Sequence, residues 1–142
     1  MSGLAQQSAM YSTSQQWNVG DCVTDMSWSP DSGKVVVSDA AGMLSVFDVQ
    51  TGQMVWSVIA HDSGASQVEW RPNGGAIASS GQDGVVKLWH PESGETLVFL
   101  AVGDRWVDHI AWSPDGNKLA TSSGKTLVVW DPQGNEILRY ED

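Results

Sequence analysis

The chain has 142 residues, which is the length of one ordinary domain. Seven Lys and Arg residues against 17 Asp and Glu residues give a formal net charge of −10. This charge argues against binding to nucleic acid, which needs cations to neutralise phosphates, and against an anionic membrane surface. The single cysteine, Cys22, excludes an internal disulfide and is typical of a reducing compartment, so we expect a cytoplasmic protein.

The first predicted elements are a flexible N-terminal segment and a leading strand. Residues 1–14 have few strand formers and several Ser, Gln and Gly residues, so we expect them to be flexible. They lack the charged start and apolar stretch of a signal peptide, and no stretch of the chain approaches the roughly 18 apolar residues of a membrane span. Residues 15–20, which include Trp17, are predicted as a leading strand.

From there the sequence repeats with a period of 42 residues. Trp28, Trp70 and Trp112 each begin a Trp-X-Pro motif, and their spacing is 42 residues in both cases (70 − 28 and 112 − 70). Two further markers recur in constant order: Phe47-Asp48, Trp89-His90 and Trp130-Asp131, then Thr51-Gly52, Ser93-Gly94 and Gln133-Gly134. The sequence therefore contains three repeats, over residues 21–61, 62–103 and 104–142.

Each repeat contains four short strand-forming segments, and Gly, Pro and Asp residues separate them. The segments show no helical period. The pattern predicts an all-β chain of three four-stranded antiparallel blades, of the kind that build a β-propeller. The predicted strands are 26–28, 34–38, 43–47 and 53–59 in the first repeat, 68–70, 76–80, 85–89 and 95–100 in the second, and 110–112, 118–122, 126–130 and 136–140 in the third.

The chain resembles the WD-repeat family of β-propellers over roughly residues 15–142. The second repeat carries the resemblance best, because residues 79–89 (Ser-Ser-Gly-Gln-Asp-Gly-Val-Val-Lys-Leu-Trp) are similar to the family's turn and third strand. The resemblance implies a hydrogen-bonded tetrad that locks a blade and is structural rather than catalytic. Carried over to this chain, the tetrad consists of His61, Ser79, Asp83 and Trp89.

The first and third repeats depart from this pattern. Val19 and Gly103 stand where the histidine is expected. The turn at 122–125 is one residue shorter and lacks the aspartate, and residues 38–42 have no aspartate at the matching place. We therefore expect only the middle blade to carry the full tetrad.

Three blades are too few to close a ring, because propellers typically have about four to eight. An arc leaves one apolar face uncovered at each end. A homodimer could close a six-bladed ring, or the chain could be part of a longer propeller. Residues 15–20 align with the fourth strand of the later repeats, yet the third repeat has its own fourth strand at 136–140. The extra strand favours the longer propeller.

No motif indicates catalysis or metal binding. Residues 73–75 and 81–84 are tight turns that open no helix, so they are not phosphate loops. His61, His90 and His109 are far apart and lack paired metal-ligand spacing. We expect no catalytic residue, no metal and no cofactor. The alternative is a small-molecule, metal or enzymatic site in the central channel of the assembled propeller.

The remaining candidate site is a surface for protein partners. The resemblance implies that the loops before the first strands line a rim where partners dock. Trp106, beside Arg105, is either a binding hot spot or a cap over its blade. One aspartate per repeat on this rim favours a basic partner, although solvated loop aspartates give the same pattern. We expect a non-catalytic protein-interaction scaffold, and the predicted rim residues are Asp21, Thr24, Asp62, Ser66, Asp104, Arg105, Trp106 and Asp108.

Overall fold

The computed structural model describes residues 16–142, so the predicted flexible segment, 1–14, and Gln15 lie outside the described residues. The described part consists of strands and turns, arranged as three sheets of four strands. Within residues 16–142, no helix is long and apolar enough to span a bilayer. The sheets confirm the all-β prediction.

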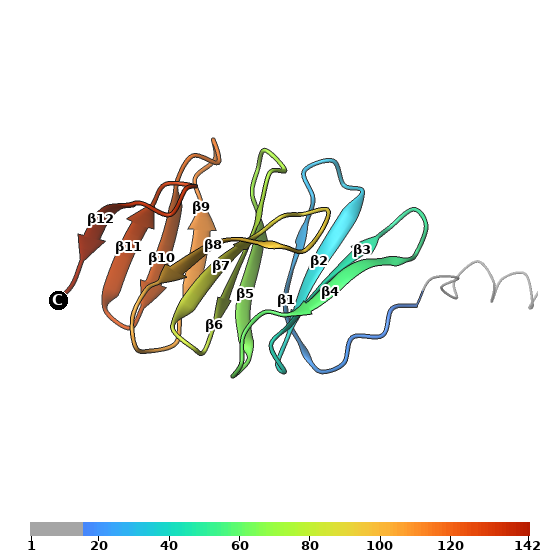
Figure 1. The fold of residues 1–142 in the computed structure, drawn as a ribbon, viewed down its shortest axis with the longest axis horizontal. Coiled ribbons are helices and arrows are strands. Elements are labelled where there is room, and N and C mark those ends of the chain that lie inside the picture. The colour runs from blue at the N-terminus through green and yellow to red at the C-terminus, as the bar shows by residue number, and fades with distance from the viewer. Residues whose placement is uncertain (1–15) are drawn as a thin grey trace, which may run out of the picture.

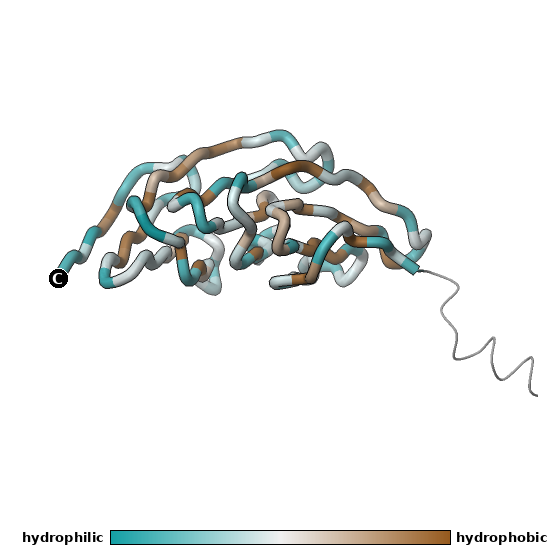
Figure 2. The backbone as a smooth tube through the Cα atoms, turned by 90° about the horizontal axis from the view of Figure 1, so that it is seen from below, coloured by the Kyte–Doolittle hydropathy of each residue, from teal (hydrophilic) through white to brown (hydrophobic). Residues whose placement is uncertain are grey.

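Each repeat forms one antiparallel sheet in which strands adjacent in sequence are adjacent in space. The three sheets stand side by side and follow one another along an arc (Figures 1 and 2). Blade 1 contains β1 (Val23–Trp28), β2 (Lys34–Asp39), β3 (Met43–Asp48) and β4 (Met54–Ile59). Blade 2 contains β5 (Ala65–Trp70), β6 (Ile77–Gly81), β7 (Val85–Trp89) and β8 (Thr96–Ala101). Blade 3 contains β9 (His109–Trp112), β10 (Leu119–Ser123), β11 (Thr126–Trp130) and β12 (Glu136–Tyr140).

The hydrophobic core lies between the blades. Because successive side chains of a strand point to opposite faces, each blade has two apolar faces and needs a neighbour on both sides. Val36, Leu44 and Val46 of blade 1 pack in one cluster with Trp70 and Ile77 of blade 2. An equivalent cluster joins blades 2 and 3.

The two outer faces of the arc lack such a neighbour. Trp28 is 58% exposed, whereas its counterparts Trp70 and Trp112 are each 7% exposed. At the other end, Leu127 of blade 3 is 39% exposed, whereas its counterpart Val86 is fully buried. The same repeat position is thus buried or exposed according to whether another blade stands beside it.

Residues 16–20 cover part of the outer face of blade 1. Trp17 stacks on Phe47, with ring centroids 4.7 Å apart and an interplanar angle of 16°. Its indole Nε1 donates to the carbonyl oxygen of Gly52 at 2.9 Å. No strand is assigned to residues 16–20, in contrast to the predicted leading strand over 15–20. The physical reason is that the described residues offer this segment no three-stranded blade with a free edge to pair with.

Polar side chains on the first strands of blades 1 and 2 hydrogen-bond to the backbone of the next blade. Asp25 Oδ2 accepts from the backbone N–H of Val68 at 3.1 Å, and Ser27 Oγ accepts from that of Trp70 at 3.0 Å. Gln67 and Glu69 accept in the same way from Ile110 and Trp112 of blade 3. These contacts give backbone donors partners where the first strands approach one another.

Candidate functional site

The structure brings the four tetrad residues of blade 2 together. Trp89 Nε1 donates to Ser79 Oγ at 2.8 Å, and Ser79 Oγ lies 2.8 Å from His61 Nε2. His61 Nδ1 lies 3.0 Å from Asp83 Oδ2. His61 and Ser79 are buried, at 1% and 0% exposure. The four side chains form one continuous relay from the third strand to the turn before it.

The relay fits a neutral imidazole. The Ser79 hydroxyl can donate to Nε2 only if Nε2 carries no proton, and Nδ1–H then donates to the Asp83 carboxylate. Burial lowers the pKa of His61, and this effect outweighs the opposing attraction of Asp83. Every polar atom of the relay has a partner in this state, which is the condition for a buried polar network to stabilise a fold.

Gly81 leaves the space that the histidine ring fills. A Cβ at this position would lie 2.4 Å from His61 Cγ. Blades 1 and 3 have no histidine at the position that matches His61, and both carry a side chain at the position that matches Gly81, Asp39 and Ser123. Asp39, 2% exposed, accepts from the N–H groups of residues 41 and 43 through Oδ1. Ser123 donates to the carbonyl oxygen of Arg105 at 3.1 Å. Where the histidine ring is absent, the side chain at this position hydrogen-bonds to nearby backbone groups instead.

Blade 3 keeps part of the relay. Trp130 Nε1 donates to Thr121 Oγ1 at 2.9 Å, and the Thr121 hydroxyl donates to the carbonyl oxygen of Val128 at 3.2 Å. This pair was not predicted from the sequence, although Thr121 stands 42 residues after Ser79. In blade 1, Val37 and Phe47 occupy the corresponding positions, so that blade packs apolar side chains there instead.

The predicted rim residues lie in the loops that precede β1, β5 and β9 and at the start of those strands. Because each loop enters the first strand of a blade, all three loops belong to one edge of the arc. Thr24 Oγ1 and Ser38 Oγ are 2.9 Å apart, and Asp108 Oδ2 accepts from the N–H of Gly124 at 3.0 Å. Asp21, Asp62 and Asp104 are exposed and Ser66 is half-buried. The structure thus places at least one exposed aspartate per blade along this edge, and blade 3 has two, because Asp108 is also exposed.

The rim is most developed on blade 3. Trp106 is 58% exposed. Together with Asp104, Arg105, Asp108 and Gly124 it lines an open depression of about 430 Å³. An exposed indole beside a guanidinium is the type of group that anchors protein interfaces.

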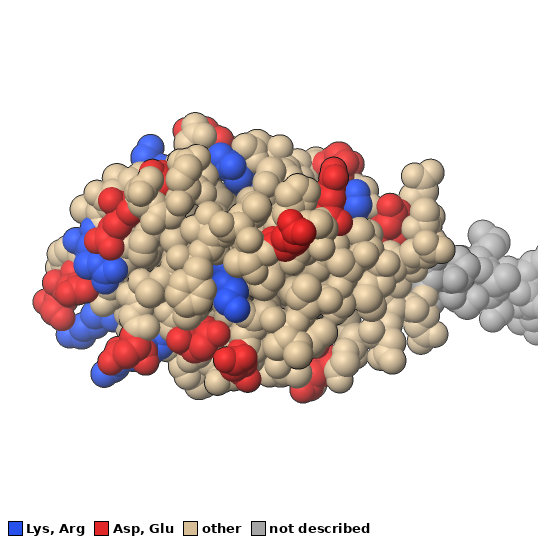
Figure 3. Space-filling model, in the orientation of Figure 1, with Lys and Arg blue, Asp and Glu red and all other residues tan. Residues whose placement is uncertain are grey.

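Charge is unevenly distributed over the face shown in Figure 3. Charged side chains gather toward blade 3 and along the edges, and much of the surface over the outer strands of blade 1 is uncharged. Exposed apolar residues of the outer strands include Val55 and Ile59 on β4 of blade 1 and Leu97 and Phe99 on β8 of blade 2. Among the described residues, no group of three His, Cys, Asp or Glu side chains is arranged to hold a metal ion.

Two family profiles match the chain. The profile described as "Anaphase-promoting complex subunit 4 WD40 domain" matches residues 51–105, and "WD domain, G-beta repeat" matches residues 97–131. No curated protein sequence matches the chain.

Solved structures are also similar to it. The computationally designed Ika4 protein has a TM-score of 0.78 and 24% identity, over 87% of this chain and 75% of that one. The structure of U3-55K has a TM-score of 0.83 and 14% identity, over 87% of this chain and 40% of that one. The designed Ika8 protein has a TM-score of 0.74 and 25% identity, over 83% of this chain and 36% of that one.

Proposed function

We propose, on the premise that this chain belongs to the WD-repeat family of β-propeller proteins, that it is a non-catalytic scaffold whose three blades form part of a longer propeller. WD repeats in general serve as protein-interaction scaffolds, and the family membership confirms the resemblance seen in the sequence. The observation that carries the proposal is the contrast between Trp28, 58% exposed, and its buried counterparts. An apolar face of this kind favours a covering neighbour.

The contacts of residues 16–20 support a longer propeller. Trp56, on the fourth strand of blade 1, donates its indole N–H to Pro91 in the turn between the third and fourth strands of blade 2. Trp17 donates in the same way to Gly52 in the corresponding turn of blade 1. Residues 16–20 therefore contact blade 1 in the way that the fourth strand of blade 1 contacts blade 2. A preceding blade that contributes only its first three strands would pair with this segment.

Closure by a second copy of the chain fits these contacts less well. In that arrangement blade 3 of one copy would stand before blade 1 of the other. The fourth strand of that blade, β12, already pairs with β11. It would therefore have to lie where residues 16–20 lie against blade 1. Moreover, Ala111 stands where Ser27 and Glu69 accept a backbone N–H from the next blade. An alanine methyl group cannot accept from the N–H of Trp28.

The scaffold is expected to bind its protein partner at the rim of blade 3. Trp106 and Arg105 supply an exposed anchor, and the aspartates of the same edge favour a basic partner. Quantitative affinity purification with the Trp106→Ala and Asp104→Lys variants tests this site. Phe99→Ala is the matched control, because Phe99 is an aromatic of similar exposure, 60%, on the outer strand β8.

We expect both rim variants to lose partners that the wild type and the control retain. If all four samples retain identical partners, the rim is not the binding site. If the control loses the same partners, the loss is a general effect of removing an exposed aromatic side chain.

A further inference from the structure

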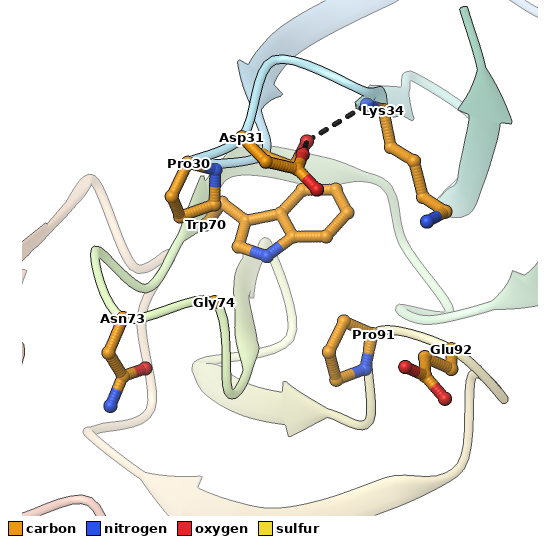
Figure 4. Close-up of a pocket in the computed structure, with 9 residues that line it drawn as sticks. Pro30, Asp31, Lys34, Trp70, Asn73, Gly74, Pro91 and Glu92 are labelled. Carbon is orange, nitrogen blue, oxygen red and sulfur yellow. Dashed lines mark hydrogen bonds between the residues drawn. The ribbon is translucent and has the colours of Figure 1, made fainter. Parts of the chain in front are cut away.

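A second recess lies at the opposite edge of the arc, between blades 1 and 2. It has a volume of about 230 Å³ and is formed by the turns after β1, β5 and β7 (Figure 4). These turns are at the far ends of the strands from the predicted rim. The lining residues used in the argument are Ser29, Asp31, Lys34, Trp70, Gly74 and Glu92.

The wall of this pocket contains a buried donor that lacks a partner. Among the buried side-chain nitrogen and oxygen atoms of the described residues, Trp70 Nε1 is the one without a hydrogen bond. Trp70 is 7% exposed, and its indole nitrogen points into the pocket, toward Gly74 and Pro91 (Figure 4). By contrast, Trp112 Nε1 at the next junction donates to the carbonyl oxygen of Glu69 at 3.2 Å. An unpaired buried N–H is costly, so this junction lacks an acceptor that the next junction supplies.

The junction between blades 2 and 3 shows what fills the equivalent space. There, the guanidinium of Arg71 lies over the ring of Trp112, with its carbon 5.5 Å from the ring centroid. Its Nε donates to the carbonyl oxygen of Gly116 at 2.7 Å. An arginine side chain thus lies between an indole and a glycine carbonyl of the following blade.

The repeat places other residues at these positions between blades 1 and 2. Ser29 stands 42 residues before Arg71, and its short side chain cannot reach over Trp70. Trp70 and Gly74 correspond to Trp112 and Gly116, so the indole and the glycine carbonyl are both retained. The junction between blades 1 and 2 therefore has the indole and the glycine carbonyl that contact the arginine at the next junction, but it has no arginine.

The pocket also has two carboxylates at positions that are neutral at the next junction, where Asp115 stands in place of Asn73. Asp31 replaces the neutral Asn73, and Glu92 replaces the neutral Gln133. Asp31 Oδ1 accepts from the Ser29 hydroxyl at 2.6 Å and from the backbone N–H of Gly33 at 2.9 Å. The Ser29 hydrogen bond is the main cause that lowers the pKa of Asp31, so this carboxyl group is ionised at neutral pH.

We propose that this pocket binds an arginine side chain of a partner peptide. The guanidinium stacks on Trp70 and donates to the carbonyl oxygen of Gly74, as Arg71 does at the next junction. The carboxylates of Asp31 and Glu92, which line the pocket, pair with the charge.

The proposal does not depend on how the propeller is closed. Both walls of the pocket belong to this chain and are present in the three blades described here. It also differs in location from the rim of blade 3, so the failure of one site leaves the other untouched. Lys34 lines the same pocket and competes with an incoming cation, and we therefore expect the Lys34→Ala variant to bind arginine more tightly than the wild type.

The test is titration of the full chain with the peptide acetyl-Gly-Arg-Gly-amide, followed by the indole N–H resonances in a ¹⁵N–¹H NMR spectrum. The Trp70→Phe variant assigns the Trp70 resonance. We expect this resonance to shift and saturate with a dissociation constant on the order of millimolar, as a single side chain allows. The Trp112 resonance, whose site is already filled by Arg71, is expected to stay in place. The Asp31→Asn, Glu92→Gln double variant should bind about two- to tenfold more weakly.

Two matched substitutions separate pocket binding from attraction to an acidic protein. Ser29→Arg places the chain's own guanidinium over Trp70 and should abolish the shift. Ser113→Arg makes the same change of charge at the corresponding position of blade 3, where no further blade stands, and should leave binding as in the wild type. The proposal is overturned if neither the wild type nor Lys34→Ala shows a saturable shift, if the shift persists in Ser29→Arg, or if acetyl-Gly-Lys-Gly-amide or acetyl-triglycine-amide produces it equally.

Discussion

Replacing Ser79 with alanine probes the relay that holds blade 2 together. Ser79 is fully buried, and its hydroxyl serves both His61 Nε2 and Trp89 Nε1 at 2.8 Å. The substitution removes little volume but leaves one buried acceptor and one buried donor without partners. Each such loss costs about 1–3 kcal/mol, so we expect Ser79→Ala to lower the free energy of unfolding by about 2–6 kcal/mol. Domains of this size are stable by only about 5–15 kcal/mol.

Two companion variants give the expected scale. Thr121→Val removes the hydroxyl that Trp130 uses in blade 3 and keeps the side-chain volume, so it orphans one donor and should cost about 1–3 kcal/mol. Ser63→Ala changes an exposed loop serine and should fall within about 0.5 kcal/mol of the wild type. Urea unfolding followed by circular dichroism measures all three, at one protein concentration because association adds to apparent stability. A Ser79→Ala value no larger than that of Ser63→Ala would refute the role given to the relay.

Three further predictions follow from the same contacts. Because burial lowers the pKa of His61, the unfolded chain binds a proton that the folded chain does not. The free energy of unfolding is therefore greatest above a pH of about 6.5 and falls below it, by up to about 1.4 kcal/mol per pH unit. In urea unfolding at several pH values, the His61→Gln variant should show a smaller slope. Trp17→Ala uncovers Phe47 and should cost about 1–3 kcal/mol in the same assay, whereas Trp106→Ala, at an exposed indole, should cost about 1 kcal/mol or less; equal costs would contradict the covering role of Trp17. Gly94→Ala should destabilise by at least about 1 kcal/mol, because φ is +74° and a Cβ would lie 2.7 Å from the Trp56 ring, and a neutral result in thermal unfolding would argue against that contact.

The sequence predicted the blades well because their turns are marked. Each Trp-X-Pro motif ends a first strand, and each Gly of the later markers lies in the turn before a fourth strand, so the elements could be placed by counting. The starts of the first strands were predicted too late: β1 begins at Val23 and β5 at Ala65, each three residues before the predicted start. Asp25 and Gln67 in these segments break the apolar alternation because they hydrogen-bond to the next blade.

Other features depend on how the blades stack against one another, and short sequence motifs do not predict these contacts. Trp17 was assigned to a strand, but its described contacts are a ring stack and one indole hydrogen bond to blade 1. The pocket beside Trp70 arises from one substitution between repeats, serine at position 29 for arginine at position 71. The difference can be read from the sequence, because these are the residues that directly follow Trp28 and Trp70 in the Trp-X-Pro motifs. Its consequence appears only when the turns of two blades are brought together.

The outer faces of the three-blade arc need a neighbour that covers them. Trp28 and Met26 at one end, 58% and 62% exposed, and Leu138 and Tyr140 at the other, 53% and 60% exposed, are the residues that a neighbouring blade would bury. Sedimentation equilibrium over a wide range of concentrations tests this most directly. We expect a mass above that of one chain, which rises with concentration as the exposed faces associate. A stable, fully folded species with the mass of a single chain at every concentration would contradict it.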